Sequence, residues 1–355
     1  METLKIAIIS SSMVLTPPIN YGTEITTYWL ARELAKKHEV YLYAPLNESK
    51  YYKNMNARRI PCTYGLMNYE LESKALEWYS KEILSLDVML DISSTLINTE
   101  LIHWKYPHMP HAFYKIGMSF SNPRIGRHNA VVQSSLQKEY ALKGIDPFFG
   151  SPLQSTMGFY PGTYKDSKVI NLGIPLNEYE YSEDKEDYIL YLSRFHISKG
   201  FDQAIKLAKE LKFKLVMAGS IEFLDHLTGF QLAYDLAGGD ENIKFVLNPS
   251  QQERIELLKK ASALILPTQK AEAFGLVILE ALATGTPVLT NKQFITEELK
   301  PAVYDINESN IRYALKKELP YKKNREYAEK FSVERFASNF EDLLKQVANK
   351  ITWGE

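Results

Sequence analysis

Two glutamates surround a predicted helix start in the second half of the chain, with residue types suited to binding hydroxyl groups. The apolar residues 275–284 predict a helix, with Gly285 as its left-handed C-terminal cap and Pro287 just beyond. Glu272 precedes this helix and Glu280 lies within it. A carboxylate accepts two hydrogen bonds from a vicinal diol, which suits Glu280 to a ribose and Glu272 to a hexose. The alternative is an amphipathic helix with two solvated glutamates.

The start of this helix, at Phe274, Gly275 and Leu276, is suited to an anion. Backbone N–H groups in a first helical turn have no partner within the helix and carry the positive end of its dipole. Such a turn holds a phosphate or a sugar hydroxyl, and Gly275 permits close approach. The segment is therefore predicted to bind a sugar nucleotide.

Two cations, Arg194 and Lys199, follow a predicted strand at residues 188–193. Open α/β sheets bind ligands at the carboxyl ends of their strands. A diphosphate would bring negative charge beside the two glutamates, and a helix start offers it only ~0.3–1 kcal/mol. Charge-assisted hydrogen bonds of ~1.5–3 kcal/mol each from these cations would offset that repulsion and stabilise a departing phosphate. Two surface cations without a ligand are the alternative.

The segment from Glu272 to Glu280, E-A-F-G-L-V-I-L-E, resembles the signature of the retaining glycosyltransferases of family 4. Residues 189–205 resemble the family's strand, R-x-x-x-x-K-G and helix, so that Arg194 and Lys199 fall on its diphosphate-binding pair. Residues 16–34 resemble its P-P-x-x-Y-G-G-x-E segment, with threonine in place of the second glycine.

The resemblance implies an α/β fold of the GT-B type, with two Rossmann-like parallel-sheet domains facing each other across a cleft. It places an acceptor-side domain at residues 1–172, a donor-binding domain at 173–330 and a final helix at 331–355 that crosses back to the first domain. Alternating strand-like and helix-like segments agree with two parallel sheets. The predicted strands lie at residues 4–10, 39–45, 88–93, 111–117 and 129–135, and at 188–193, 214–220, 243–248, 263–268 and 287–291.

The activity that the resemblance implies is retaining transfer of a hexose from a nucleoside-diphosphate sugar, with a UDP-sugar as first choice. No metal or cofactor is implied, and no Asp-x-Asp triplet of the metal-dependent GT-A type is present. The acceptor, a glycan, a lipid-linked glycan or a small molecule, is not identified. The residues assigned to catalysis are Glu272, Arg194 and Lys199, and those assigned to donor binding are Glu280, Phe274, Gly275, Leu276, Gly22, Thr23 and Asn248.

The acceptor half departs from the family. Residues 90–92, Leu-Asp-Ile, stand where the family often has H-x-H, and Pro110 is followed by Ile-Gly at 116–117 in place of H-G. Residues 290–293 replace a glycine-rich turn. The lost histidines leave open a different sugar or acceptor, a histidine supplied from nearby such as His111, or a non-catalytic sugar-nucleotide or glycan binder. A GT-B-like epimerase or phosphorylase is a third alternative that no feature favours.

The composition is that of an ordinary globular protein, with 355 residues, 45% hydrophobic, 24% charged and a net charge of −1. This excludes a nucleic-acid-coating protein, and no apolar run reaches the roughly 20 residues of a membrane span. The single cysteine, Cys62, fits a reducing compartment, so a cytoplasmic location is expected, with peripheral attachment to the inner membrane face left open. The aromatic segment 144–164 is either an acceptor loop or a loop that packs its own side chains.

Overall fold

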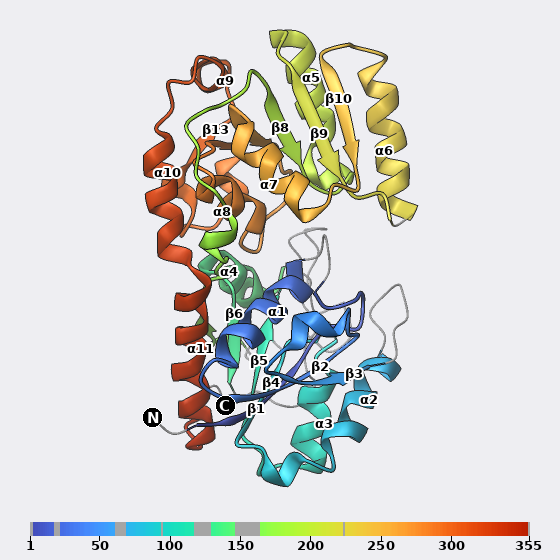
Figure 1. The fold of residues 1–355 in the computed structure, drawn as a ribbon, viewed down its shortest axis with the longest axis vertical. Helices are drawn as coiled ribbons and strands as arrows, with labels where there is room; N and C mark the ends of the chain where they lie inside the picture. The colour runs from blue at the N-terminus through green and yellow to red at the C-terminus, as the bar shows by residue number, and fades with distance from the viewer. Residues whose placement is uncertain are drawn as a thin grey trace. The chain divides into compact units, whose positions relative to one another are not determined.

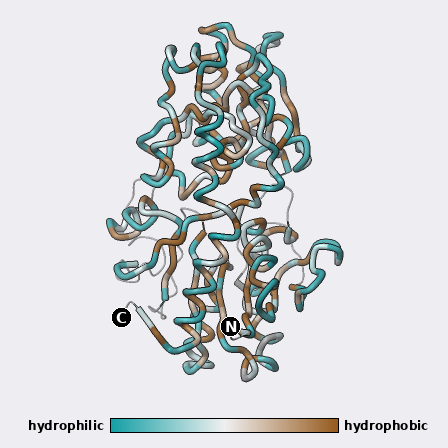
Figure 2. The backbone as a smooth tube through the Cα atoms, turned by 60° about the vertical axis from the view of Figure 1, so that its left-hand side comes forward, coloured by the Kyte–Doolittle hydropathy of each residue, from teal (hydrophilic) through white to brown (hydrophobic). Residues whose placement is uncertain are grey.

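The chain divides into two compact units, each built on one parallel sheet (Figure 1). The computed structural model describes residues 3–17, 22–60, 69–93, 95–116, 129–145, 164–222 and 224–353. Unit 1 comprises Met1–Gly173 with Val333–Glu355, and unit 2 comprises Ile174–Ser332. The predicted fold class, two parallel-sheet α/β domains, is confirmed. Hydrophobic stretches alternate with hydrophilic ones along the chain (brown and teal in Figure 2), as buried strands alternating with half-exposed helices require.

The sheet of unit 1 has seven strands in the order β3-β2-β1-β4-β5-β6-β7. Every neighbouring pair is parallel, with Ile6 of β1 beside Val40 of β2 on one side and beside Val88 of β4 on the other. The strands are β1 (Lys5–Ile9), β2 (Glu39–Ala44), β3 (Asn56–Arg59), β4 (Val88–Asp91), β5 (His111–Lys115), β6 (Ala130–Val132) and β7 (Lys168–Val169).

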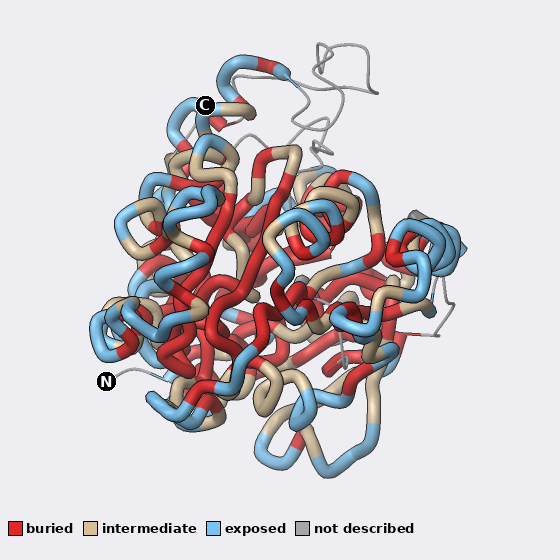
Figure 3. Tube along the Cα trace, turned by 90° about the horizontal axis from the view of Figure 1, so that it is seen from above, coloured by how far each residue is buried: buried red, intermediate tan, exposed pale blue. Residues whose placement is uncertain are grey.

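Helices cover both faces of this sheet, and its central strands are buried. Figure 3 shows buried stretches (red) toward the inside and exposed ones (pale blue) mainly at the outside. Side chains of α2 and α3 pack against one face, around Ala7, Ile9 and Met89. Because the crossover between parallel neighbours is usually a helix, strands and helices largely alternate along the chain. The connection from β2 to β3 is an exception, with only the 3-10 turn Ser49–Tyr52. Among the described residues before position 174, the α-helices are α1 (Gly22–Leu34), α2 (Tyr69–Tyr79), α3 (Ile97–Lys105) and α4 (Ser135–Lys143).

The last helix, α11 (Val333–Ala348), belongs to unit 1 although the chain reaches it after unit 2. It packs against α1, β4 and β5, and the ring of Phe340 lies 4.9 Å from that of Tyr114 on β5. The predicted final helix that returns to the first domain is confirmed. None of the helices in the described part of the chain has the length and hydropathy that a bilayer span requires.

A buried carboxylate ties α11 to the turn between α1 and β2. Glu341 accepts hydrogen bonds from Lys345 Nζ at 2.6 Å and from Lys37 Nζ at 2.8 Å. His38 Nε2 lies 3.5 Å from the same carboxylate. The hydrogen bonds from Lys345 and Lys37 lower the pKa of Glu341 to about 2.

This depressed pKa predicts an acid-sensitive step in unfolding. A carboxylate whose pKa is lower in the folded chain stabilises the fold above its unfolded pKa, and that contribution is lost as pH falls toward about 2. Because Lys37 is largely exposed, we expect the contribution to be only about 1–2 kcal/mol. Thermal unfolding followed between about pH 3 and pH 7 should therefore show a smaller acid-induced decrease in Tm for Glu341→Gln than for wild type. Equal decreases in the two proteins would contradict this role.

Unit 2 has a six-stranded parallel sheet in the order β10-β9-β8-β11-β12-β13. Its strands are β8 (Ile189–Leu192), β9 (Leu215–Gly219), β10 (Ile243–Leu247), β11 (Ala263–Leu266), β12 (Val288–Thr290) and β13 (Val303–Asp305). Its helices are α5 (Phe201–Leu211), α6 (Leu224–Ala237), α7 (Gln251–Lys260), α8 (Leu276–Ala283), α9 (Glu308–Leu315) and α10 (Tyr321–Ala328).

The order of these strands creates a switch point between β8 and β11. From β8 the chain moves outward to β9 and β10, and then it returns to the other side of β8 to form β11. The loops that follow β8 and β11 therefore leave the sheet in opposite directions. Open α/β sheets bind ligands in the crevice that this divergence leaves at the carboxyl ends of the strands.

Candidate functional site

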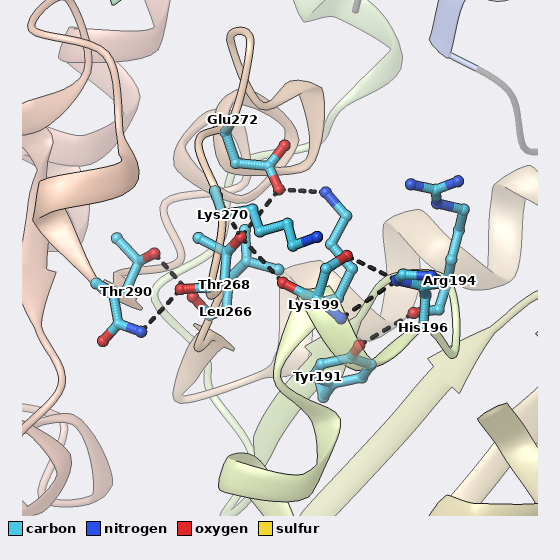
Figure 4. Close-up of polar contacts among 11 residues, drawn as sticks. Tyr191, Arg194, His196, Lys199, Leu266, Thr268, Lys270, Glu272 and Thr290 are labelled. Carbon is cyan, nitrogen blue, oxygen red and sulfur yellow. Dashed lines mark hydrogen bonds and ion pairs between the residues drawn. The ribbon is translucent and has the colours of Figure 1, made fainter. Parts of the chain in front are cut away.

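The two loops at the switch point bring a lysine and a glutamate together. Lys199 follows β8, Glu272 follows β11, and the Lys199 ammonium donates to Glu272 Oε1 across 73 residues of sequence (Figure 4). The side chains are only 17% and 15% exposed. The Thr268 hydroxyl lies 3.4 Å from the same carboxylate oxygen. Two of the three residues assigned to catalysis thus form one partly buried ion pair.

Gly200 lets the two loops approach this closely. Its φ is +72°, and a Cβ built there would lie 1.9 Å from the carbonyl oxygen of Pro267. The Gln269 N–H donates to the Ser198 carbonyl at 2.9 Å, which joins the loops just beside the ion pair. Only glycine adopts this left-handed backbone readily and also has no Cβ to collide with Pro267.

Replacing Gly200 by alanine is therefore expected to separate the two loops. The new methyl group meets backbone atoms that cannot rotate away, and the left-handed conformation adds about 1 kcal/mol or more of strain. We expect Tm to fall by at least several degrees, since each kcal/mol corresponds to about 2–4 °C in a domain of this size. Gly239→Ala is the matched control, because Gly239 also has a positive φ, +76°, but a Cβ at that residue would have no atom within 4 Å. Equal changes in Tm would contradict the steric explanation.

Two further cations point toward the ion pair. Figure 4 shows the exposed Arg194 side chain and that of Lys270 extending to the same region as the ammonium of Lys199. Arg194 was predicted, whereas Lys270 was missed, because a lysine in a loop gives no local signal of function. The site therefore holds the Lys199–Glu272 pair with two more cations extending to the same region, which suits it to an anion with more than one negative charge.

Glu280 is held by two side chains that the sequence did not suggest. It is 6% exposed, its Oε1 accepts from the Tyr179 hydroxyl at 2.9 Å, and its Oε2 accepts from Arg254 Nη2 at 2.8 Å. Tyr179 precedes β8 and Arg254 lies on α7, so three separate segments meet here. Each carboxylate oxygen retains a second lone pair, so a ligand hydroxyl can still bind.

The start of α8 is a glycine cap with a left-handed backbone. Gly275 is its N-cap residue, with φ of +98°, and the Glu272 N–H just before it donates to the Phe294 carbonyl at 2.9 Å. The Phe274 side chain is buried against Phe331, with ring centroids 5.6 Å apart, so this residue can offer a ligand only its backbone. At the other end, Gly285 has φ of +85°, which confirms the predicted left-handed cap.

The remaining donor-binding candidates lie elsewhere. Gly22 and Thr23 open α1 in unit 1, and residues 18–21 of their motif lie outside the described part of the chain. Asn248 directly follows β10 in unit 2 with φ of +49°, and its Oδ1 accepts from the Ile221 N–H at 2.9 Å. Asn248 therefore closes the turn after β9 in addition to any contact with a ligand.

Asp91 and His111, which lie at or near the departures from the family, are hydrogen-bonded within unit 1. Asp91, in the position of the lost H-x-H, accepts hydrogen bonds from the backbone N–H groups of Ser93 at 2.9 Å and Thr99 at 2.8 Å. His111 lies on β5 with Nδ1 2.9 Å from the Met109 carbonyl. Cys62 and most of the aromatic segment 144–164 lie outside the described residues.

Sequence comparison finds a family match that lies within unit 2. Residues 178–331 match the family model described as Glycosyl transferases group 1. An uncharacterized glycosyltransferase of Methanocaldococcus jannaschii is 29% identical over 181 residues, 47% of this chain and 45% of that protein. D-inositol 3-phosphate glycosyltransferase of Mycobacterium avium is 32% identical over 133 residues, 37% of this chain and 29% of that protein. The chain thus spans less than half the length of these curated relatives.

Structural comparison extends the similarity over the whole chain. AviGT4, a glycosyltransferase involved in avilamycin A biosynthesis, superposes with a TM-score of 0.71 at 18% identity, covering 99% of each chain. HepE of Anabaena, in complex with UDP, gives a TM-score of 0.66 at 12% identity, covering 97% of this chain and 100% of that one. At such identities the similarity defines the fold, which is that of the GT-B glycosyltransferases. Residues 178–331 therefore form a domain of the glycosyl transferases group 1 family, within a chain that has the GT-B fold throughout.

Proposed function

We propose that this protein is a retaining glycosyltransferase of family 4, which transfers a hexose from a nucleoside-diphosphate sugar. The observation that carries the proposal is the Lys199–Glu272 ion pair, placed beside Arg194 and Lys270 at the switch point of a group 1 domain. Three cations there suit a diphosphate, and a carboxylate beside them suits a sugar.

A bound donor can replace Glu272 as the partner of Lys199. Glu272 neutralises Lys199 in a partly buried position. A bound diphosphate competes for the Lys199 ammonium and frees Glu272 to accept hydrogen bonds from the sugar hydroxyls. Arg194 and Lys199 then stabilise the charge that develops on the phosphate as the glycosidic bond breaks.

The reaction as the family performs it needs no nucleophile from the protein. The bond between the anomeric carbon and the phosphate oxygen breaks, and the acceptor oxygen bonds to the same carbon on the same face. The departing phosphate takes the proton of the acceptor hydroxyl. Because the new bond forms on the face that the phosphate leaves, the configuration at the anomeric carbon is kept. In this proposal Glu280 binds the ribose, and the backbone of residues 274–276 binds the sugar and phosphate.

UDP-sugars are the first donors to consider, because UDP is bound in the HepE structure that shares this fold. We assign acceptor binding to unit 1 and leave the acceptor class open among glycans, lipid-linked glycans and small molecules. A peripheral membrane location would follow only from a lipid-linked acceptor.

A non-catalytic sugar-nucleotide binder is the second candidate. The observation that favours it is the segment 90–92, which stands where the family often has H-x-H. Ile92 is buried at the second histidine position, and Asp91 between the two positions is committed to hydrogen bonds with Ser93 and Thr99. Such a protein would bind a donor and never consume it.

A thermal-shift screen tests the proposal. Wild type and Arg194→Ala are heated with uridine, guanosine and adenosine diphosphates and their sugars. A ligand that binds only the folded state stabilises it by about 2.7 kcal/mol at a hundredfold excess over its Kd. We expect one nucleotide class to raise the Tm of wild type and to raise that of the variant much less. No response to any nucleotide would refute the donor site, and donor binding without turnover on any acceptor would favour the binder.

A further inference from the structure

A histidine lies within the loop that carries the predicted diphosphate pair. His196 stands between Arg194 and Lys199, and its Nδ1 accepts the Ser198 N–H at 3.2 Å, which caps the short 3-10 turn Ile197–Lys199. The Ser198 hydroxyl lies 2.7 Å from the same nitrogen. Since Nδ1 accepts the backbone N–H, the neutral ring carries its proton on Nε2.

Helix α6 packs directly against this loop. A Cβ at Gly229 would lie 1.8 Å from the Phe195 carbonyl oxygen, so the helix backbone itself touches the residue before His196. One turn earlier, His226 is buried at 3% exposure, with its Nε2 3.7 Å from Asp225 Oδ2. His196 and His226 are close enough for the charge of one to lower the pKa of the other.

The charges around His196 come from three segments. Burial and the positive charges of Arg194, Lys270 and Lys199 lower its pKa, while the carboxylate of Asp225 opposes them. Burial likewise lowers the pKa of His226, against the opposing charge of Asp225. Both rings are therefore neutral at pH 7 in this arrangement.

A bound diphosphate would reverse the balance of charges that now lowers the pKa of His196. It brings roughly two negative charges to the cations that now disfavour a charged ring, and a nearby opposite charge favours the protonated form of histidine. The Ser198 hydroxyl can accept as well as donate, so a protonated Nδ1 can donate to it at the present 2.7 Å. The charged ring keeps this hydroxyl as its partner and gives up the 3.2 Å hydrogen bond from the Ser198 N–H.

We propose, on the basis of the proposed donor site, that His196 is a further ligand of the donor diphosphate and takes up a proton when the donor binds. By linkage, protons then favour donor binding to the same extent that the donor favours proton binding. Donor affinity falls as pH rises through the window between the pKa values of the free and bound protein, by at most about tenfold per pH unit.

Calorimetric titration with UDP-glucose, GDP-mannose and ADP-glucose between about pH 5 and pH 8 tests this. The phosphates of these sugar nucleotides do not titrate in that range, so pH dependence belongs to the protein. Titrations in two buffers of different ionisation enthalpy count the protons taken up. The variant is His196→Asn, because asparagine also accepts the Ser198 N–H as a cap but does not titrate. The control is His108→Gln, an exposed histidine of unit 1.

Wild type and His108→Gln are expected to take up a fraction of a proton that approaches one, and His196→Asn much less, with a flatter dependence of affinity on pH. Ser198→Ala keeps the His196 ring but removes the hydroxyl that can accept a hydrogen bond from its protonated form. This variant should also take up less of a proton when the donor binds. A donor that binds with no proton uptake, or with equal uptake in His196→Asn, would overturn this inference and leave the donor site intact. If none of the three probes binds wild type at any pH, the proposed function fails, and this inference fails with it.

Discussion

Replacing Lys199 by alanine is expected to slow turnover of the donor by about 10- to 100-fold. A charge-assisted hydrogen bond to a diphosphate is worth ~1.5–3 kcal/mol, and each 1.4 kcal/mol is about one factor of ten. The upper end is expected, because the variant also leaves the Glu272 carboxylate, only 15% exposed, without its cation and facing the incoming phosphate. The measurement is the initial rate of nucleotide release at a donor concentration well below KM.

Lys206→Ala is the matched control, since Lys206 lies on the neighbouring helix α5 with a side chain 73% exposed and pairs with Glu210. That variant should keep wild-type rates. Unchanged turnover in Lys199→Ala would show that the ion pair is only a structural link between the loops.

A double variant separates the two functions of Glu272. If Glu272 only neutralises Lys199, the combined change Lys199→Ala with Glu272→Ala should be no slower than Lys199→Ala alone. If Glu272 also binds the sugar, as we propose, the double variant should be slower by a further factor of about ten.

Replacing Glu280 by alanine is expected to reduce both stability and nucleotide affinity. The change leaves Arg254 without its carboxylate and the buried Tyr179 hydroxyl without its acceptor. Breaking a fully buried pair costs about 3–5 kcal/mol, but Arg254 is partly exposed, so about 1–3 kcal/mol is expected. At about 2–4 °C per kcal/mol, this is a readily measured decrease in Tm.

The nucleotide effect is measured separately, by titrating free nucleoside diphosphate below the Tm of each variant. Glu280→Ala should weaken this binding by about tenfold, because a ribose contact worth about 1.4 kcal/mol is lost. Tyr179→Phe is the control for stability, since it removes one hydrogen bond to Glu280 and keeps the carboxylate. Glu272→Ala should bind free nucleotide almost as well as wild type and mainly slow transfer. Equal losses of free-nucleotide affinity in Glu272→Ala and Glu280→Ala would contradict this division of roles.

Most of the strands could be predicted from the sequence because buried strands are short runs of apolar residues, which are visible locally. The apolar runs around Ile8, Leu190 and Ile265 became central strands that are buried on both faces. The polar edge strand β3, Asn56–Arg59, was missed, because pairing with β2 rather than its own composition makes it a strand. Helix α6 was missed as well. Its leucines are exposed, as at the 79% exposed Leu224, whereas its buried residues are His226, Ala233 and Ala237, so its apolar residues do not mark the buried face.

The sequence by itself determined which residues are candidates for the site. Glycine before an apolar helix, carboxylates at its start and cations after a buried strand are local patterns, and they identified Glu272, Lys199 and the cap at Gly285. Only the tertiary structure decided their partners. In the folded chain Lys199 pairs with Glu272 across 73 residues, and Lys270 extends to the same region. Glu280 accepts hydrogen bonds from Tyr179 and Arg254. Those contacts follow from the order of strands in the sheet, which burial of the whole domain sets, and no short stretch of sequence carries that information.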